Sequence, residues 1–514
     1  MNVKFIFSLF LIASSLFTYA QTDVVEKIVK EATENSHLET LAHQLLDQIG
    51  PRLVGTPEMK QANDWAVSTY KGWGIEARNE QWGEWRGWQR GISHIDLVYP
   101  RVKSLEGMQL AWNPSTSPKG VTAELISIPE LSSAAEFENW LPNVKGKIVL
   151  VSMPEKTGRP DYNWEKFATP ESFEKMKKDR DSQAEAWNNR IKNTGYNSRT
   201  LPEILEKSGA VGIVQSYWSK GFGVNKIFSA RTKKIPTVDI SLEDYGLIYR
   251  LAESGQKPKI RIIAESKELG VVPTFNTIAE IKGSEKPDEY IILSAHFDSW
   301  DGGTGATDNG TGTLTMMEAL RILKIVYPNP KRTILVGHWG SEEQGLNGSR
   351  AFVEDHPEIV DKVQAVFNQD NGTGRVENIS GQGFLHAYDY IGRWLQAVPE
   401  NYKKGIKTEF PGVPGGGGSD YASFVAAGAP AFSLSSLSWD YWNYTWHTNR
   451  DTYDKIVFDD LRSNAILTAI LVYMASEDPE TTSREKSILP INPRTGEKRT
   501  WPEPRKATRK GGLD

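Results

Sequence analysis

Three short apolar runs, each followed by an acidic or imidazole side chain, constrain the fold of this chain more than any other feature. The runs are EYIILSA before His296, RTILVGHWGS before Glu342 and Glu343, and VQAVFNQ before Asp370. Each run is rich in Val, Ile and Leu and has the length of an interior strand of a parallel sheet. Ligands of open α/β sheets bind outside the carboxyl ends of the strands. We therefore expect these side chains to meet at one edge of a sheet.

The first run continues into AHFDSWDGGTGATDNGTGT, which contains His296, Asp298 and Asp308. Side chains alternate along an extended strand, so His296 and Asp298 are expected to point to the same side. The Asp298 carboxylate can then accept a hydrogen bond from His296 and fix the tautomer of the imidazole. Asp308 precedes an expected apolar helix over residues 311–325, where the helix dipole favours a carboxylate that bridges two cations. Considered alone, Asp308 also has the ordinary interpretation of a helix cap.

Glu342 and Glu343 are adjacent carboxylates directly after an expected strand. Burying both without a cation is costly, and a metal bound by one with a water held by the other removes that cost. A solvated acidic loop is the alternative for this pair, and a simple turn is the alternative for Asp370 in FNQDNGTG. His447 lies in the aromatic segment YTWHTNRDTYDKI. The other histidines are interpreted as structural or surface residues: His37, His43, His94, His338, His356 and His386.

The joint pattern is more specific than any of its parts. The chain has no cysteine, so imidazoles and carboxylates are the available strong ligands, and this donor set is typical of a zinc-type hydrolytic site. Two cations bridged by one carboxylate polarise a carbonyl and activate a water together. A carboxylate-rich site of this kind also accepts manganese or cobalt.

The 514 residues are too many for one compact core, and the sequence divides into five segments. Residues 1–20 have the basic start, apolar stretch and small-residue end of a cleaved signal peptide. Residues 21–104 form the N-terminal part of the expected peptidase domain, with a helical stretch over 24–49 and a second helix ending near Gly74. Residues 105–270 are expected to form an inserted module, and residues 271–478 alternate strands and helices as in a doubly wound, mostly parallel α/β sheet. Residues 479–514 form a basic tail, expected to be extended over the surface or disordered.

Charge and composition exclude several function classes. The net charge of -5 is small for this length and favours no nucleic-acid partner. After the signal peptide no segment reaches the length of a membrane span. An exported protein, secreted or periplasmic and without disulfides, fits these observations best.

These motifs together resemble the co-catalytic zinc aminopeptidase and glutamate carboxypeptidase family, and within it the plasma glutamate carboxypeptidase branch. The resemblance covers most of the mature chain. It implies the zinc exopeptidase fold, with a protease-associated domain inserted at 105–270 whose strands are GKIVLV, GAVGIV and IPTVDIS. It also implies a homodimer as a candidate assembly.

The resemblance assigns a role to each site residue, with two zinc ions as the cofactors. It implies that Asp308 bridges the zincs, His296 and Asp370 complete one site, and Glu343 and His447 complete the other. It implies that Glu342 is the general base and that Asp298 orients His296. The residues alone leave open which of the two glutamates is the base.

The expected substrate is a dipeptide or short peptide with a free N-terminus. Aromatic residues near His447 are candidates for an apolar pocket wall, with core packing as the alternative: Trp439, Tyr441, Trp442, Tyr444 and Trp446. The glycines of residues 415–418, with Ser419 and Asp420, would let a substrate approach the backbone, and no arginine patch for a glutamate side chain is evident. The alternatives are a carboxypeptidase that reads the C-terminus, a non-catalytic binding protein on the same fold, and a glutaminyl-cyclase-like acyltransferase. The acyltransferase works with one zinc and typically lacks a protease-associated insertion.

Overall fold

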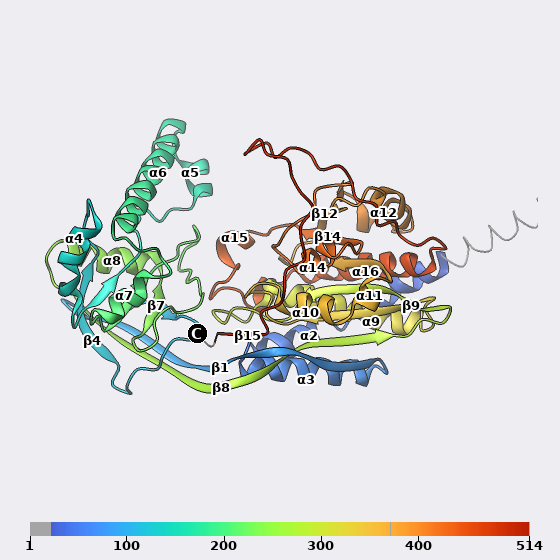
Figure 1. The fold of residues 1–514 in the computed structure, drawn as a ribbon, viewed down its shortest axis with the longest axis horizontal. Coiled ribbons are helices and arrows are strands. Elements are labelled where there is room, and N and C mark those ends of the chain that lie inside the picture. Colours follow the sequence, from blue (N-terminus) through green and yellow to red (C-terminus); the bar gives the residue numbers. More distant parts are fainter. Residues whose placement is uncertain (1–21, 371, 513–514) are drawn as a thin grey trace, which may run out of the picture.

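Two units share one antiparallel ribbon of two long strands (Figure 1). The computed structural model describes residues 22–370 and 372–512, so the expected signal peptide lies outside the described residues. The ribbon strands are β1 (Glu76–Tyr99) and β8 (Lys259–Ile281), which pair along almost their whole length. The end of β8 pairs with the larger unit and its start pairs with the smaller one. The ribbon therefore physically joins the two cores.

The larger unit is built on a mixed sheet that contains the three apolar runs as neighbours. Its strand order is β13-β12-β14-β11-β9-β10-β8. The strands not yet named are β9 (Lys286–His296), β10 (Arg332–Trp339), β11 (Val363–Asn368), β12 (Val376–Ser380), β13 (Lys407–Glu409) and β14 (Ala431–Ser436). Strand β9 is parallel to both β10 and β11, and β11 is parallel to β14. A mixed α/β fold with a large, centrally parallel sheet is thus present, as the sequence predicted.

Helices cover this sheet on both faces, and the most buried of them is the apolar helix that follows Asp308. That helix, α9 (Thr311–Val326), agrees with the predicted 311–325 and packs against α16 (Phe458–Glu477). The expected helical stretch over 24–49 is interrupted near Ser36 into a helix over residues 22–34, α2 (Leu38–Ala42) and η1 (His43–Ile49). The remaining helices of this unit are α3 (Pro57–Gly72), η3 (Ala306–Gly310), α10 (Asn347–Asp355), α11 (Pro357–Val360), α12 (Ala387–Gln396), α13 (Glu400–Lys403), α14 (Tyr421–Ala426), α15 (Tyr441–Tyr444) and η4 (Tyr453–Lys455).

The smaller unit has its own α/β core. Its strands are β3 (Gly107–Gln109), β4 (Val121–Ser127), β5 (Ile148–Leu150), β6 (Gly212–Gln215) and β7 (Thr237–Ile240), of which β4 to β7 are mutually parallel. Its helices are α4 (Ala134–Trp140), η2 (Leu141–Val144), α5 (Asp161–Phe167), α6 (Pro170–Asn193), α7 (Leu201–Lys207) and α8 (Leu242–Glu253). The expected boundary between residues 270 and 271 falls inside β8, because the ribbon runs on without a linker.

The basic tail is extended and ordered along much of its length. Lys486 forms a β-bridge with Phe384, and β15 (Lys510–Gly511) adds in parallel to β1 at Glu84 and Trp85 (Figure 1). Strand β2 (Lys103–Ser104) pairs with β1 elsewhere, at Asp96 and Leu97. Among residues 22–370 and 372–512, no helix has both the length and the apolar character needed to span a bilayer.

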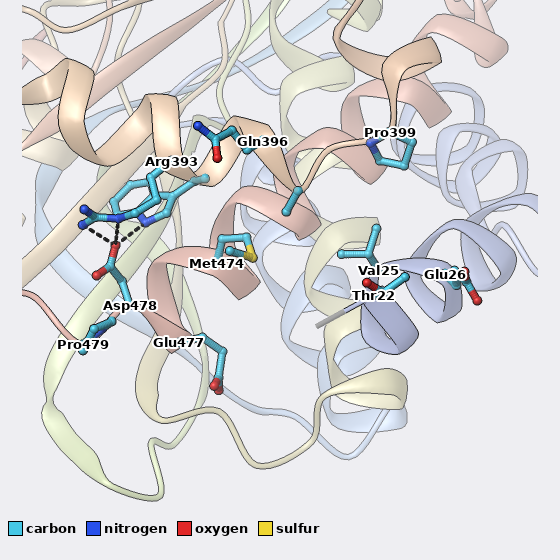
Figure 2. Close-up of a pocket in the computed structure, with 12 residues that line it drawn as sticks. Thr22, Val25, Glu26, Arg393, Gln396, Pro399, Met474, Glu477, Asp478 and Pro479 are labelled. Atoms are coloured by element: carbon cyan, nitrogen blue, oxygen red, sulfur yellow. Dashed lines mark hydrogen bonds and ion pairs between the residues drawn. The ribbon is translucent and has the colours of Figure 1, made fainter. Parts of the chain in front are cut away.

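A cavity of about 620 Å³ lies between the helix over residues 22–34, α12 and α16 (Figure 2). Its wall includes Val25 and Met474, and the Asp478 carboxylate accepts hydrogen bonds there from the Arg393 guanidinium and the Trp394 indole. None of the predicted metal ligands lines this cavity, so it is separate from the candidate active site.

Candidate active site

The predicted strand ends converge on one edge of the sheet. Strand β9 ends at His296, which is in register with Trp339 at the end of β10. Glu342 and Glu343 follow three and four residues later, and Asp370 follows the end of β11 at Asn368. Because the three strands are parallel neighbours, their chain ends deliver these side chains to the same place.

Two groups of candidate metal ligands form there, and Asp308 belongs to both. In the first group, His296 Nε2 lies 3.2 Å from Asp370 Oδ1 and 3.4 Å from Asp308 Oδ1. In the second, His447 Nε2 lies 2.9 Å from Glu343 Oε2 and 3.3 Å from Asp308 Oδ2. Within each group the ligand atoms all lie within 4.8 Å of one another. The five predicted ligands are therefore brought together, with one Asp308 oxygen facing each group.

The Asp298 carboxylate forms its hydrogen bonds with the turn that contains Glu342 and Glu343, and not with His296 as the sequence predicted. The ring nitrogen His296 Nδ1 lies 3.0 Å from the main-chain oxygen of Asp298, whereas the nearer carboxylate oxygen is 3.7 Å away. The carbonyl is an acceptor, so Nδ1 carries the proton and Nε2 faces the ligand group. The buried Asp298 carboxylate accepts hydrogen bonds from the backbone N–H groups of Glu342 at 2.9 Å and Glu343 at 3.3 Å. The side chain thus holds the Glu-Glu turn, and the backbone of the same residue orients His296.

Glu342 lies beside the two groups and belongs to neither. Burial raises the pKa of Glu342 well above its usual value; the nearby His296 opposes this shift, while Asp370 and Glu343 add to it. A carboxyl group with a raised pKa next to a polar cluster is a candidate for proton transfer.

The electrostatics of this cluster favour the binding of a positively charged group. Burial lowers the pKa of each imidazole, but the adjacent carboxylates more than offset this, so the pKa of His447 rises to about 9 and that of His296 rises well above its usual value. Burial, opposed by His447 and reinforced by Asp308, raises the pKa of Glu343 to about 7. Among the described residues, no lysine or arginine forms an ion pair with Asp308, Glu343 or Asp370.

Burying carboxylates without such partners has a high free-energy cost unless a cation is bound. The enclosed Glu343 Oε1 also finds no hydrogen-bond donor among the residues that the structure describes. Two imidazole nitrogens and three carboxylates around a shared aspartate are the donors that zinc accepts. The residues present therefore fit zinc.

Two buried residues that sequence reasoning did not select support the ligand loops. The Arg52 guanidinium donates to the carbonyl oxygens of Phe297 at 2.7 Å, Thr304 at 2.8 Å and Gly305 at 2.9 Å. Asp451 accepts from the backbone N–H groups of Thr307 at 2.7 Å and Asp308 at 3.1 Å.

Asp420, which follows the glycine run, is a further buried acid that interacts electrostatically with His296. Burial raises its pKa to about 7, His296 opposes this shift, and Asp370 and Asp298 add to it. The sequence signals for Arg52 and Asp451 were the GPR and NRD tripeptides, and neither is specific.

The smaller unit fixes the loop that carries His447. The backbone N–H of Ile227 donates to the carbonyl oxygen of His447 at 2.9 Å, and Lys226 forms a β-bridge with Thr448. The side chains of Asn225 and Asn449 are hydrogen-bonded to each other at 3.0 Å. These contacts join segments more than 200 residues apart in the chain, so the last ligand is positioned by both units.

The aromatic residues near His447 divide into two sets. Trp446 lies against the imidazole with ring centroids 4.0 Å apart, and Tyr441 is buried. Trp439 and Trp442 are more than half exposed. Phe228 of the smaller unit and Trp300 complete the aromatic surroundings of His447, at 5.0 Å and 6.0 Å.

Comparison with known proteins agrees with this geometry. Residues 276–472, which contain all five candidate ligands and Glu342, match the profile of peptidase family M28. This segment belongs to peptidase family M28. The chain is also 26% identical over 471 residues to carboxypeptidase Q of Rattus norvegicus and 25% identical over 472 residues to that of Homo sapiens, covering 90% of both chains in each case.

Solved structures show the same fold. A peptidase M28 precursor from Shewanella amazonensis superposes with a TM-score of 0.68 at 24% identity, covering 90% of this chain and 98% of that one. A zinc aminopeptidase from Bacillus subtilis superposes with a TM-score of 0.56 at 19% identity, covering 88% and 97%. Together the M28 matches confirm the predicted family resemblance and the prediction of a zinc-dependent exopeptidase.

Proposed function

We propose that this M28 peptidase is an exported exopeptidase that holds two zinc ions and hydrolyses dipeptides or short peptides with a free N-terminus. The observation that carries the proposal is the sharing of Asp308 between two complete ligand groups, with Glu342 beside them. In this proposal His296 and Asp370 hold one ion, Glu343 and His447 hold the other, and Asp308 contacts both. Bound zinc would supply Lewis-acid polarisation of the scissile carbonyl and activation of water.

The residues of the chain then move the proton. Glu342, as general base, takes a proton from the attacking water and passes it to the amine of the leaving group. General-base catalysis of this kind contributes about 10²–10⁴-fold to rate. Asp298 keeps Glu342 in place through the backbone N–H that its carboxylate accepts.

The segment assignments belong to the same proposal. Residues 1–20 act as a signal peptide that directs the chain to the periplasm or the exterior, and residues 21–104 and 271–478 make up the peptidase domain. Residues 105–270 form a protease-associated domain, a proposal supported by the parallel β4 to β7 strands packed with helices. The expected partner is a peptide substrate, with no nucleic acid and with a homodimer as the candidate assembly.

A carboxypeptidase that reads the C-terminus is the second candidate, supported by the name of the relatives that align along 90% of the chain. A panel of dipeptides, each with a free and an acetylated N-terminus, distinguishes the two candidates. Cleavage restricted to free N-termini and abolished by a chelator supports the first proposal. Equal cleavage of the acetylated set supports the second candidate, and no chelator-sensitive cleavage of either set would refute both.

A further inference from the structure

A small polar cavity lies in the part of the smaller unit that helices α5 and α6 form (Figure 1). Its volume is about 140 Å³. One face of α6 contributes Met176, Arg180 and Gln183 to its wall, at the spacing of three or four residues that places side chains on one side of a helix. Glu155, from the loop after β5, and Trp164, from α5, also line it. None of the candidate active-site residues lines this cavity, so it is a separate site.

Four buried side-chain atoms of this wall form no hydrogen bond with any residue that the structure describes. Two are acceptors, Glu155 Oε2 and Gln183 Oε1, and two are donors, Arg180 Nε and Trp164 Nε1. Glu155 Oε2 lies 3.9 Å from Arg180 Nε, which is too long for a hydrogen bond. Buried polar atoms in native proteins nearly always have partners, so a ligand or ordered water is expected to contact these four atoms.

The Arg180 guanidinium is held in place by its other two nitrogens. Nη1 donates to the Asp161 carboxylate, and Nη2 donates to the carbonyl oxygens of Arg159 at 2.7 Å and Thr157 at 3.1 Å. Asp161 also accepts from the Lys220 ammonium group at 2.6 Å. The Nε–H that makes no hydrogen bond is therefore presented from a fixed position, as a binding site requires.

The charges around the cavity balance without a ligand. Two carboxylates, Glu155 and Asp161, lie among two cations, Arg180 and Lys220. Burial nevertheless raises the pKa of Glu155, with Arg180 and Lys220 opposing the shift and Asp161 adding to it. A cationic group beside Glu155 would stabilise its carboxylate, and an anionic group beside Arg180 would use the Nε–H. A ligand that carries one group of each sign satisfies both and keeps the network neutral.

A larger cavity, of about 630 Å³, lies along the same face of α6. Its wall includes three aromatic side chains, Trp187 of α6 and Tyr217 and Trp218 after β6. Glu155 lines both cavities, and Trp187 is one helical turn beyond Gln183. The larger cavity also includes the residues that follow β5 and β6, and the carboxyl ends of parallel strands are where α/β sheets bind ligands. Its aromatic wall suits an apolar group next to the polar cavity.

We propose that these two cavities together bind a free α-amino acid with an apolar side chain. Its ammonium group donates to Glu155 and Gln183. Its carboxylate accepts from Arg180 and Trp164, and its side chain lies against the aromatic wall of the larger cavity. At about 30 Å³ for each water-sized group, the small cavity holds about five such groups, which matches the ammonium, α-carbon and carboxylate atoms of an amino acid.

This inference goes beyond the proposed exopeptidase function, since hydrolysis does not need a second site in the smaller unit. Amino acids released by an exopeptidase would belong to the ligand class of the site.

Isothermal titration calorimetry on the full mature chain tests the inference with three matched probes. L-leucine carries both charged groups, N-acetyl-L-leucine lacks the ammonium group, and L-leucinamide lacks the carboxylate. We expect leucine to bind at least tenfold more tightly than either derivative. Glu155→Gln should weaken leucine binding at least tenfold, and Trp164→Phe, which removes the indole N–H but keeps an aromatic ring, at least threefold. Glu165→Gln, at an exposed position of α5, is the control and should leave leucine binding unchanged.

Leucine is also a candidate ligand of the metal site, and Asp308→Asn separates the two locations. Binding in the smaller unit should persist in Asp308→Asn. It should also persist if the wild type hydrolyses no dipeptide, an outcome that would refute only the exopeptidase proposal. Three results would overturn the inference: no leucine binding by the folded wild type, equal affinities for leucine and both derivatives, or leucine binding that is lost in Asp308→Asn but unchanged in Glu155→Gln and Trp164→Phe. The first of these would mean that the small cavity holds ordered water only.

Discussion

The carboxylate of Asp298 accepts a hydrogen bond of 2.9 Å from the backbone N–H of Glu342. One end of strand β9 thus supplies a ligand, His296, and also holds the turn after β10 in which Glu342 and Glu343 lie. A side chain that accepts hydrogen bonds from a loop in this way fixes the position of the loop's acidic residues, here Glu342 and Glu343, more than it changes their charge.

Removing the Asp298 carboxylate should therefore loosen the turn. Asp298→Ala leaves two enclosed backbone N–H groups without an acceptor, and each unsatisfied group costs about 1–3 kcal/mol. We expect a lower free energy of unfolding in urea and a loss of kcat larger than the change in KM. Asp288→Ala, at an exposed position near the start of the same strand, is the control. Unchanged kcat in a destabilised Asp298→Ala protein would show that the turn does not depend on this contact.

Glu342→Gln should separate metal binding from catalysis. The substitution keeps the shape of the side chain but removes the base, so we expect about 10²–10⁴-fold lower kcat with unchanged zinc content. Zinc content is measured by elemental analysis and kcat with the best dipeptide of the panel, with the exposed Glu400→Gln as control. Substantial activity in Glu342→Gln would exclude this residue as the base.

The two ligand groups predict different metal losses. His296→Ala and His447→Ala each remove a ligand from one group, so each should lower the bound zinc by about one ion per chain after dialysis. Asp308→Asn weakens both groups and should lower it further. His386→Ala, whose imidazole pairs with surface acids, should keep the full content. A wild-type content of one zinc would contradict the two-ion proposal.

The pair formed by His356 and Glu80 predicts a pH-dependent stability. The hydrogen bond that the His356 ring donates to the Glu80 carboxylate raises the pKa of His356 above its usual value, so this histidine binds protons more tightly in the folded state. Its contribution is complete below about pH 6.5, the usual histidine pKa, and is lost as the pH rises through the higher folded value. The stability difference between wild type and His356→Gln should thus be larger at pH 5.5 than at pH 9. The same comparison in a Glu80→Gln background should show little pH dependence.

The sequence predicted the parts of this site that follow from strand periodicity. His296, Glu342, Glu343 and Asp370 were accessible because each follows a run whose length and composition mark a buried strand. The role of the Asp298 carboxylate could not be predicted in this way. Alternation along a strand indicates which side chains share a face, but it gives no information about the backbone N–H groups of the next turn.

Lys226 and Arg52 illustrate a second kind of limit. Lys226 contacts a ring more than 200 positions away in the chain, and the Arg52 guanidinium donates to carbonyl oxygens of a distant loop as well as to that of Gly50. Neither partner has a residue-type signal, because every residue has a carbonyl and the chain contains 17 tryptophans. Such contacts become visible only once the two units are placed in space.

The hydrogen bond from Ile227 to the carbonyl oxygen of His447 has a consequence for biosynthesis. The smaller unit emerges from the ribosome well before His447, yet the His447 loop reaches its final position only when docked against it. Because His447 is one of the proposed zinc ligands, we expect complete zinc loading only in chains whose two units have both folded and docked, and we expect a chain with a misfolded smaller unit to be inactive.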